Sequence, residues 1–138
     1  MATPIMIVGE SGTGKSTSMR NLIPEKTAII QVINKRLPFK NNFQRRTASN
    51  TQGTLMVSDN AAKISKAILG FAKLGFENII IDDFQYLMAN EFMKRSEEKG
   101  FQKFNDIAKN AWSVIMAAQS VPESACIYFM THSQVDDS

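Results

Sequence analysis

Several residue types are scarce in this sequence of 138 residues, and each scarcity excludes a class of protein. The chain has one cysteine, Cys126, so no disulfide can form within it, which fits a reducing cytoplasm. Because Cys126 lies inside an apolar run, its thiol is expected to be buried. No apolar run approaches the roughly 20 residues of a membrane-spanning helix. The N-terminus lacks the basic and apolar segments of a secretory signal. These absences predict one cytoplasmic domain over residues 1–138, with no membrane partner.

The positive charge of the chain is concentrated in its N-terminal third. The formal net charge is +3, but residues 1–50 hold eight Lys or Arg side chains and only two Glu. The rest of the chain is therefore net acidic. A basic segment of this kind favours a polyanionic partner. The alternative is a loop whose cations face only water.

Phosphate binding is indicated by residues 9–16, which read GESGTGKS and match the pattern G-x-x-x-x-G-K-[ST] completely. The glycines of this pattern let the backbone turn tightly, so that several N–H groups point at one anion, and the helix that follows adds its positive end. Lys15 is expected to reach the β- and γ-phosphates and neutralise developing charge, and the Ser16 hydroxyl to ligate Mg²⁺. The expected nucleotide-binding residues are Gly9, Glu10, Ser11, Gly12, Thr13, Gly14, Lys15, Ser16 and Thr17.

Patterns typical of strands and helices alternate along the chain. Strands are predicted at about 3–8, 27–33, 78–83 and 125–130, with a short edge strand at 55–57. Helices are predicted at about 15–22, 86–98 and 104–116, and from a cap at Ser58 or Asp59 to about residue 74. Residues 34–52 are predicted to form an irregular loop. The alternation predicts an α/β fold of three layers, in which helices cover both faces of a central, mainly parallel sheet.

Two of the predicted helices carry apolar residues three or four positions apart, which marks the face that each turns to the core. In the helix that ends near residue 74 these are Ile64, Ala67, Ile68, Phe71 and Leu74. In the last helix they are Phe104, Ile107, Ala108, Ala111, Trp112, Ile115 and Met116.

The run Ile79-Ile80-Ile81-Asp82-Asp83 ends a predicted buried strand with two acids. Acids at the carboxyl end of a parallel strand lie on the ligand side of the sheet. Asp82 is therefore expected to hold Mg²⁺, directly or through water. Asp83 is expected to be the catalytic base that activates water, with Glu10 or Glu91 as alternatives. A structural alternative for Asp83 is that it caps the next helix.

Thr131 and His132 follow the last predicted strand. In ATPases with an additional strand between the phosphate-loop strand and the strand of the metal-binding acid, a polar residue at the tip of that strand contacts the γ-phosphate or the attacking water. Both residues are therefore candidates for the catalytic site. A purely structural role for this single histidine is the alternative.

Two other classes of phosphate-loop protein need residues that this sequence lacks. A GTPase reads guanine with N-K-x-D and carries a D-x-x-G switch. Residues 34–37 (NKRL) lack the Asp, and residues 82–85 (DDFQ) lack the Gly. A small-molecule kinase has an Arg-rich lid, and residues 94–99 (KRSEEK) are too mixed in charge to form one. The sequence therefore favours an ATPase.

Three segments resemble bacteriophage P-loop ATPases of RecA/AAA type, which are linked to single-strand annealing and recombination. They are residues 29–39 (IIQVINKRLPF), 80–92 (IIDDFQYLMANEF) and 129–132 (FMTH). The resemblance covers almost the whole chain, and its most specific part surrounds Asp82. Such ATPases continue past the sensor strand with at least one more strand, so this RecA/AAA-like domain is expected to be truncated there.

The resemblance also implies ligands, partners and a location. It implies ATP and Mg²⁺ bound by residues 9–16 and Asp82, with Thr131 and His132 as the γ-phosphate sensor. It further implies single-stranded DNA as a partner, assembly into a homo-oligomeric ring or filament, and the cytoplasm of a phage-infected bacterium.

We therefore expect a Mg²⁺-dependent ATPase that acts in DNA recombination or single-strand annealing. One alternative is a nucleotide-gated module that binds DNA or protein with little hydrolysis, and another is a phosphotransferase with a small substrate. DNA contacts are expected in a basic segment that interleaves Phe39 and Phe43 with cations, because cations contact phosphates and ring faces contact bases. The expected DNA-binding residues are Arg36, Lys40, Arg45 and Arg46. The competing interpretation makes the two Phe side chains part of the core and leaves the cations in water.

Overall fold

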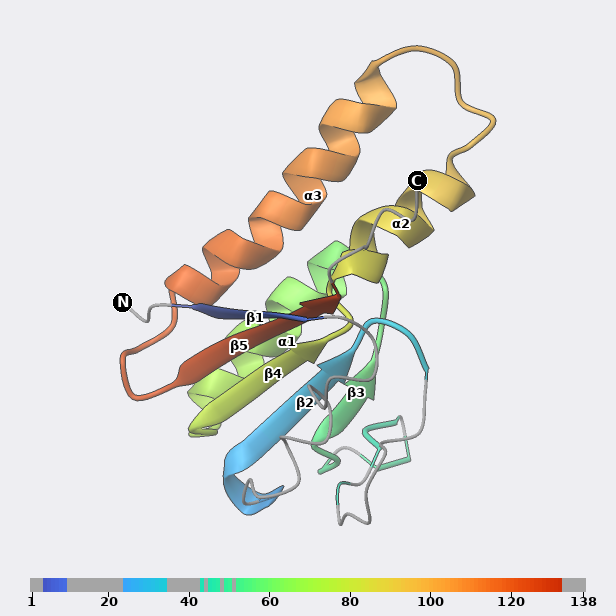
Figure 1. Ribbon diagram of the computed structural model, residues 1–138. Helices are drawn as coiled ribbons and strands as arrows, with labels where there is room; N and C mark the ends of the chain where they lie inside the picture. Colours follow the sequence, from blue (N-terminus) through green and yellow to red (C-terminus); the bar gives the residue numbers. More distant parts are fainter. Residues whose placement is uncertain are drawn as a thin grey trace.

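The computed structural model describes residues 4–9, 24–34, 43, 45–47, 49–50 and 52–132. Within these residues the chain has an α/β fold built on a five-stranded sheet, in which every neighbouring pair of strands is parallel (Figure 1). The strand order is β1-β5-β4-β2-β3. The strands are β1 (Ile5–Gly9), β2 (Thr27–Gln31), β3 (Leu55–Val57), β4 (Asn78–Asp82) and β5 (Cys126–His132).

Three helices are described, together with a short 3₁₀ turn, η2 (Pro24–Lys26). They are α1 (Ala61–Lys73), α2 (Gln85–Lys94) and α3 (Gln102–Gln119). Helices α1 and α3 lie side by side on one face of the sheet, and α2 projects beyond the edge at which the strands end (Figure 1). The helix predicted at 15–22 lies outside the described residues, so the described part of the chain has two layers of the three predicted.

The main hydrophobic core fills the space between the sheet and helices α1 and α3. Because side chains alternate along a strand, every second residue of the central strands points into it. Phe84, just after β4, packs edge-on against Phe129 of β5, with ring centroids 4.8 Å apart. The strands supply Ala28, Ile30, Ile79, Ile81, Ile127 and Phe129, and the two helices supply Ile64, Ile68, Phe71, Ala111, Val114 and Ala118.

The opposite face of the sheet carries the other residues of the same strands. Ile29, Ile80 and Met130 are buried there, against partly buried residues that include Phe43. Two positions further along β2 and β4, this face carries polar residues, Gln31 and Asp82. It therefore changes from apolar to polar where the strands end.

The N-terminal cap of α1 differs from the prediction. Asn60 is the cap, rather than Ser58 or Asp59, because its Oδ1 accepts the N–H three residues further on at 3.0 Å. The Ser58 hydroxyl accepts the N–H of Asn60, and the Asp59 carboxylate lies 2.6 Å from Lys94 Nζ of α2. That ammonium lowers the pKa of Asp59. The helix ends as predicted before Gly75, whose φ of 93° lies in the left-handed region that favours glycine.

Helix α2 ends at Lys94, before the predicted end at 98, because the following residues form a charged turn. Arg95 donates to Glu98 (Nε to Oε2, 2.7 Å) and to Asp106 of α3 (Nη2 to Oδ2, 2.9 Å). Lys103 of α3 is buried, and its Nζ lies 3.4 Å from the carbonyl oxygens of both Arg95 and Ser96. These contacts join α2 and α3 into an arm that extends beyond the sheet (Figure 1).

Five side chains predicted to face the core are exposed in the structure. The buried stripe of α3 runs through Ile107, Ala111, Val114 and Ala118. Helix α3 carries apolar residues around much of its circumference, so the sequence alone does not show which stripe meets the sheet. The exposed side chains are Leu74, Phe104, Ala108, Trp112 and Met116.

Two strand predictions and one burial prediction also need correction. Strand β2 ends at Gln31, two residues early, where the Gln31 carbonyl accepts the N–H of Ser58 at 2.9 Å. Strand β5 extends to His132, because Thr131 and His132 continue the ladder with β1 instead of following the strand. Cys126, predicted to be buried, is exposed.

Gly53 lets two backbone segments touch. A Cβ at this position would lie 2.5 Å from the Arg46 nitrogen and 2.6 Å from the Arg45 carbonyl, and the Arg46 N–H donates to the Leu55 carbonyl. We expect Gly53→Ala to lower the free energy of unfolding by about 1–3 kcal/mol, because backbone on both sides must move. Urea denaturation measures the change.

Gly70→Ala is the matched control. Gly70 lies inside α1, and a Cβ there would meet no atom within 4 Å. Alanine is more favourable than glycine inside a helix, so the free energy of unfolding of this variant should rise by about 0.5–1 kcal/mol. A stabilising or neutral Gly53→Ala variant would contradict the close approach.

Candidate functional site

The parallel sheet brings the predicted site residues that end its strands, Gly9, Asp82, Thr131 and His132, to one edge. All five strands end there, and Gly9 at the end of β1 pairs with His132 at the end of β5. Strand β5 lies between β1 and β4, as predicted for the strand that carries Thr131 and His132. Asp82 at the end of β4 is two strand spacings from β1, or about 10 Å.

Much of the predicted nucleotide site lies outside the described residues. Of the nine expected nucleotide-binding residues, the structure describes only the backbone of Gly9, in β1. The predicted roles of Glu10, Ser11, Gly12, Thr13, Gly14, Lys15, Ser16 and Thr17 therefore stay predictions. The same holds for two expected DNA-binding residues, Arg36 and Lys40, which also lie outside the described residues.

Asp82 is a buried carboxylate at the carboxyl edge of the sheet. Its side chain is 2% exposed and lies on the face opposite α1 and α3, beside Gln31 in the register of β2 and β4. A buried carboxylate is costly unless a cation or several donors accompany it. The described residues hold no cluster of three or more His, Cys, Asp or Glu that could bind a metal by itself. Carboxylate oxygens are ligands that Mg²⁺ accepts in proteins, so the predicted metal-binding role of Asp82 stays a prediction.

Asp83 leaves the strand in an unusual backbone conformation. Its φ is 57°, in the left-handed region that costs a residue other than glycine about 1–2 kcal/mol. The turn is held by the Phe84 N–H, which donates to the Met130 carbonyl at 3.0 Å, and by the Tyr86 N–H, which donates to the Asp83 carbonyl at 3.0 Å. Asp83 does not cap α2, because Phe84 occupies the cap position and no side chain bonds there. The N-cap of α2 is therefore Phe84 and not Asp83.

Glu91, an alternative base, is held between α2 and α3. Its carboxylate accepts from the Asn110 side chain, at 3.1 Å through Oε2, and lies 3.7 Å from Arg95 Nη1. These contacts join the two helices of the arm. They give Glu91 a structural task between α2 and α3.

Thr131 is half-buried in β5. The neighbouring residues Phe129 and Met130 belong to the helix-covered face and to the opposite face, respectively. Alternation therefore places Thr131 on the helix-covered face, whereas Asp82 lies on the other. The backbone of His132 lies beside Gly9.

Gln31 is a residue of this edge that the sequence reasoning missed. It ends β2 as the register partner of Asp82, and its side chain is 1% exposed. The signal in the sequence was a polar residue that interrupts the run Ala28-Ile29-Ile30-Gln31-Val32 at its carboxyl end. A polar side chain in an otherwise apolar strand requires a partner or a function.

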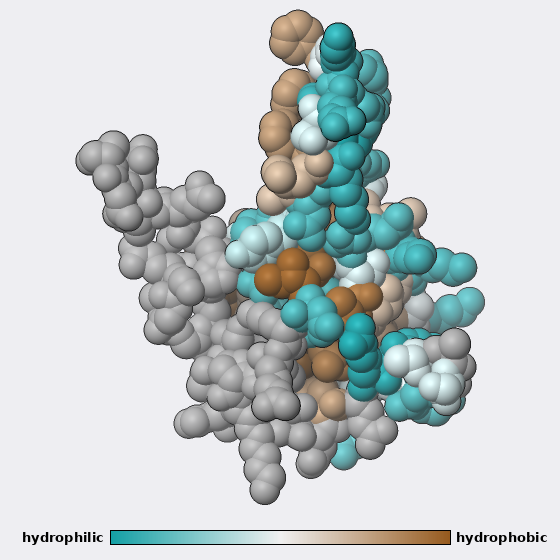
Figure 2. All heavy atoms as spheres, turned by 90° about the vertical axis from the view of Figure 1, so that its right-hand side faces the viewer, coloured by the Kyte–Doolittle hydropathy of each residue, from teal (hydrophilic) through white to brown (hydrophobic). Residues whose placement is uncertain are grey.

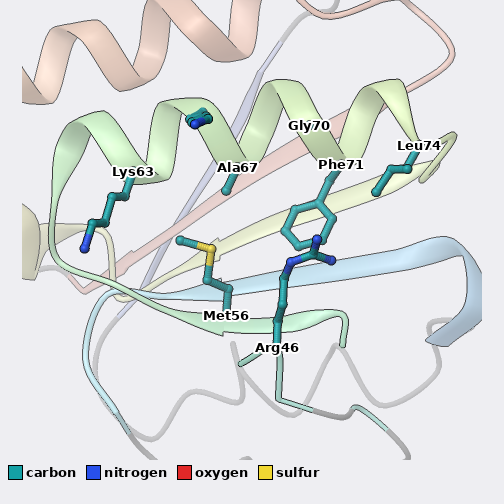
Figure 3. A pocket seen from close by; sticks show the side chains of 8 residues that line it. Arg46, Met56, Lys63, Ala67, Gly70, Phe71 and Leu74 are labelled. Carbon is teal, nitrogen blue, oxygen red and sulfur yellow. The ribbon is translucent and has the colours of Figure 1, made fainter. Parts of the chain in front are cut away.

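The predicted DNA-binding segment is only partly described. Phe43 packs against the smaller hydrophobic cluster, as the competing interpretation expected. The Arg46 guanidinium lies over the Phe71 ring, 5.7 Å from its centroid, and Nη1 donates to the Gly53 carbonyl at 3.4 Å (Figure 3). Arg46 thus has a structural role, whereas Arg45 is exposed. Arg46 lines a surface pocket with Met56, Lys63, Lys66, Ala67, Gly70, Phe71 and Leu74.

Comparison with known proteins leaves the family open. No protein-family model matches the chain, and no curated protein matches it significantly. Among the helices of the described residues, none combines the length and apolar character needed to cross a membrane. The function is therefore argued from the geometry of the carboxyl edge.

Single substitutions at Arg45 and Arg46 separate DNA contact from packing. Arg45→Ala should weaken binding of single-stranded DNA and reduce the magnitude of the slope of log K against log salt by about one or less. Its free energy of unfolding should be unchanged. Arg46→Ala should instead cost about 1 kcal/mol of stability, through the lost cation–π contact and hydrogen bond. Fluorescence anisotropy at several salt concentrations and urea denaturation measure the two effects. Unchanged affinity and salt slope for Arg45→Ala would remove this residue from the DNA interface.

Asp83→Asn tests the catalytic base. Asparagine tolerates the left-handed conformation, so the turn should survive. We expect ATP affinity within a few-fold of wild type and single-turnover hydrolysis slower by about 10²–10⁴-fold. Glu91→Gln is the matched control, because the amide can still accept from Asn110. If Glu91→Gln hydrolysed ATP slowly while Asp83→Asn kept the wild-type rate, Glu91 rather than Asp83 would be the catalytic base.

Proposed function

We propose that this protein is a Mg²⁺-dependent P-loop ATPase of RecA/AAA-like fold that acts on single-stranded DNA in recombination or annealing. The observation that carries the proposal is the strand order β1-β5-β4. It brings the strand that leads into GESGTGKS and the strand that ends in Asp82 to one edge, with the strand of Thr131 and His132 between them. Ligands bind at this edge in open parallel sheets.

The proposed chemistry assigns one task to each residue. Lys15 and the backbone of residues 9–16 bind the β- and γ-phosphates, and Ser16 with Asp82 would hold Mg²⁺. Bound Mg²⁺ supplies positive charge that neutralises the phosphate oxygens during transfer. Asp83 takes a proton from the attacking water.

A phosphotransferase is disfavoured by the ion pairs of the arm. A lid that closes over phosphates needs arginines directed at the nucleotide. Arg95 is instead bonded to Glu98 and Asp106, and these carboxylates raise the pKa of its guanidinium. In return Arg95 lowers the pKa of Glu98.

Assembly into an oligomer is supported by an apolar surface on the arm. Apolar side chains gather along one side of the arm formed by α2 and the start of α3 (Figure 2). A groove between the two helices is lined by Met88, Ala89, Phe92, Met93, Phe104 and Ile107. Contiguous exposed apolar surface of this kind is typical of protein interfaces.

Lys15→Ala and Asp82→Asn test the nucleotide site by calorimetry. Lys15→Ala should weaken ATP binding by at least about tenfold, because a charge-assisted contact is worth about 1.5–3 kcal/mol. Asp82→Asn should keep part of the affinity and lose its dependence on Mg²⁺. Lys66→Ala, an exposed position on α1, is the control. Equal ATP affinity in wild type and Lys15→Ala would refute the assigned nucleotide site. The rate of ATP hydrolysis, measured with and without single-stranded DNA, separates an ATPase from a nucleotide-gated binding module that hydrolyses little ATP.

A further inference from the structure

Gln31 carries a buried carboxamide that forms no hydrogen bond with the described part of the chain. Its side chain is 1% exposed, and neither Nε2 nor Oε1 has a hydrogen-bond partner among the residues that the structure describes. An unpaired buried donor or acceptor costs about 1–3 kcal/mol. Buried polar groups in proteins are nearly always paired. The carboxamide therefore calls for a bound group that supplies both an acceptor and a donor.

The position of Gln31 indicates what that group is. Gln31 and Asp82 are register partners at the carboxyl ends of β2 and β4, with their side chains on the same face of the sheet. Along the strand order, Gln31 lies on the far side of Asp82 from Gly9. If the phosphates begin at residues 9–16 and the metal is held at Asp82, Gln31 faces the last phosphate and the space beyond it.

We propose that Gln31 positions the attacking water in this ATPase, a role that rests on the proposed function. Its Oε1 accepts a hydrogen bond from the water, and its Nε2 donates to an oxygen of the γ-phosphate. A carboxamide cannot take up the proton, so Gln31 orients the water while Asp83 remains the base.

The step balances without any further reactant. The water oxygen forms a bond to the γ-phosphorus, and the bond between that phosphorus and the β,γ-bridging oxygen breaks. The electron pair of the broken bond stays on ADP. The water proton passes to the carboxylate of Asp83, and the products are ADP and inorganic phosphate.

Thr27 provides a control within the same strand. It is fully buried on the same face, and its Oγ1 also has no partner among the described residues. Thr27 begins β2, however, and so lies about 13 Å from Gln31, at the edge opposite the site. An unpaired polar atom there carries the same energetic cost without access to the nucleotide.

The experiment compares Gln31→Met with Thr27→Val in the full chain. Each substitution keeps the approximate shape and removes the polar atoms. Three quantities are measured: the free energy of unfolding without nucleotide, ATP affinity with Mg²⁺, and the single-turnover rate constant. We expect both variants to be at least as stable as wild type, because an unsatisfied buried group is removed. Gln31→Met should lose about 10–10³-fold in rate with affinity within about threefold, and Thr27→Val should keep the wild-type rate.

Gln31→Glu adds a second measurement, the pH dependence of the rate, which would not change if Gln31 served only for packing. Its carboxylate can orient and deprotonate water only when ionised, so the rate of this variant should rise with pH over a range in which the wild-type rate is flat. A rate for Gln31→Met within twofold of wild type, or a Gln31→Glu pH profile like that of wild type, overturns the role of Gln31. Absence of ATP binding by the wild-type protein is a separate result, which overturns the proposed function and this role together.

Discussion

The parallel direction of all five strands is the constraint on which the rest of the structure depends. Because every strand ends at the same edge, residues far apart in the sequence reach one place: Gly9, Gln31, Asp82 and His132. Parallel strands also require crossover connections, and α1 and the α2–α3 pair supply two of them. An antiparallel pairing of β4 with β5 would send Asp82 and His132 to opposite edges. The candidate site therefore follows from the direction of the strands before any side chain is considered.

The two faces of the sheet differ in the size of their hydrophobic clusters and in polarity. The face under α1 and α3 is apolar along β2 and β4 and along β5 as far as Phe129, and it holds the larger hydrophobic cluster. The opposite face has a smaller cluster and ends in two buried polar side chains, Gln31 and Asp82. Because the first face anchors the strands, the second face can carry polar side chains at the strand ends.

The arm formed by α2 and α3 explains charges that the sequence left ambiguous. In the mixed segment 94–99, Arg95 donates to the Glu98 carboxylate. Lys103, which is buried in α3, donates to the Arg95 carbonyl of the same segment. Lys103 also lies over two aromatic rings, 5.6 Å from the centroid of Phe92 and 5.3 Å from that of Phe104. The charges thus hold the two helices together, and apolar side chains stay exposed along one side of the arm (Figure 2).

The sequence by itself determined the phosphate-binding pattern, the α/β class and the acids at the end of β4, because each is encoded in a short run of neighbouring residues. Only the tertiary structure decided the strand order, the burial of Gln31 beside Asp82, and the different environments of Arg45 and Arg46. It also decided that Trp112 and Met116 face outward although their spacing suits a core-facing helix. Those properties depend on which strand lies beside which and on what covers each face. They arise from contacts between distant parts of the chain, which local periodicity does not record.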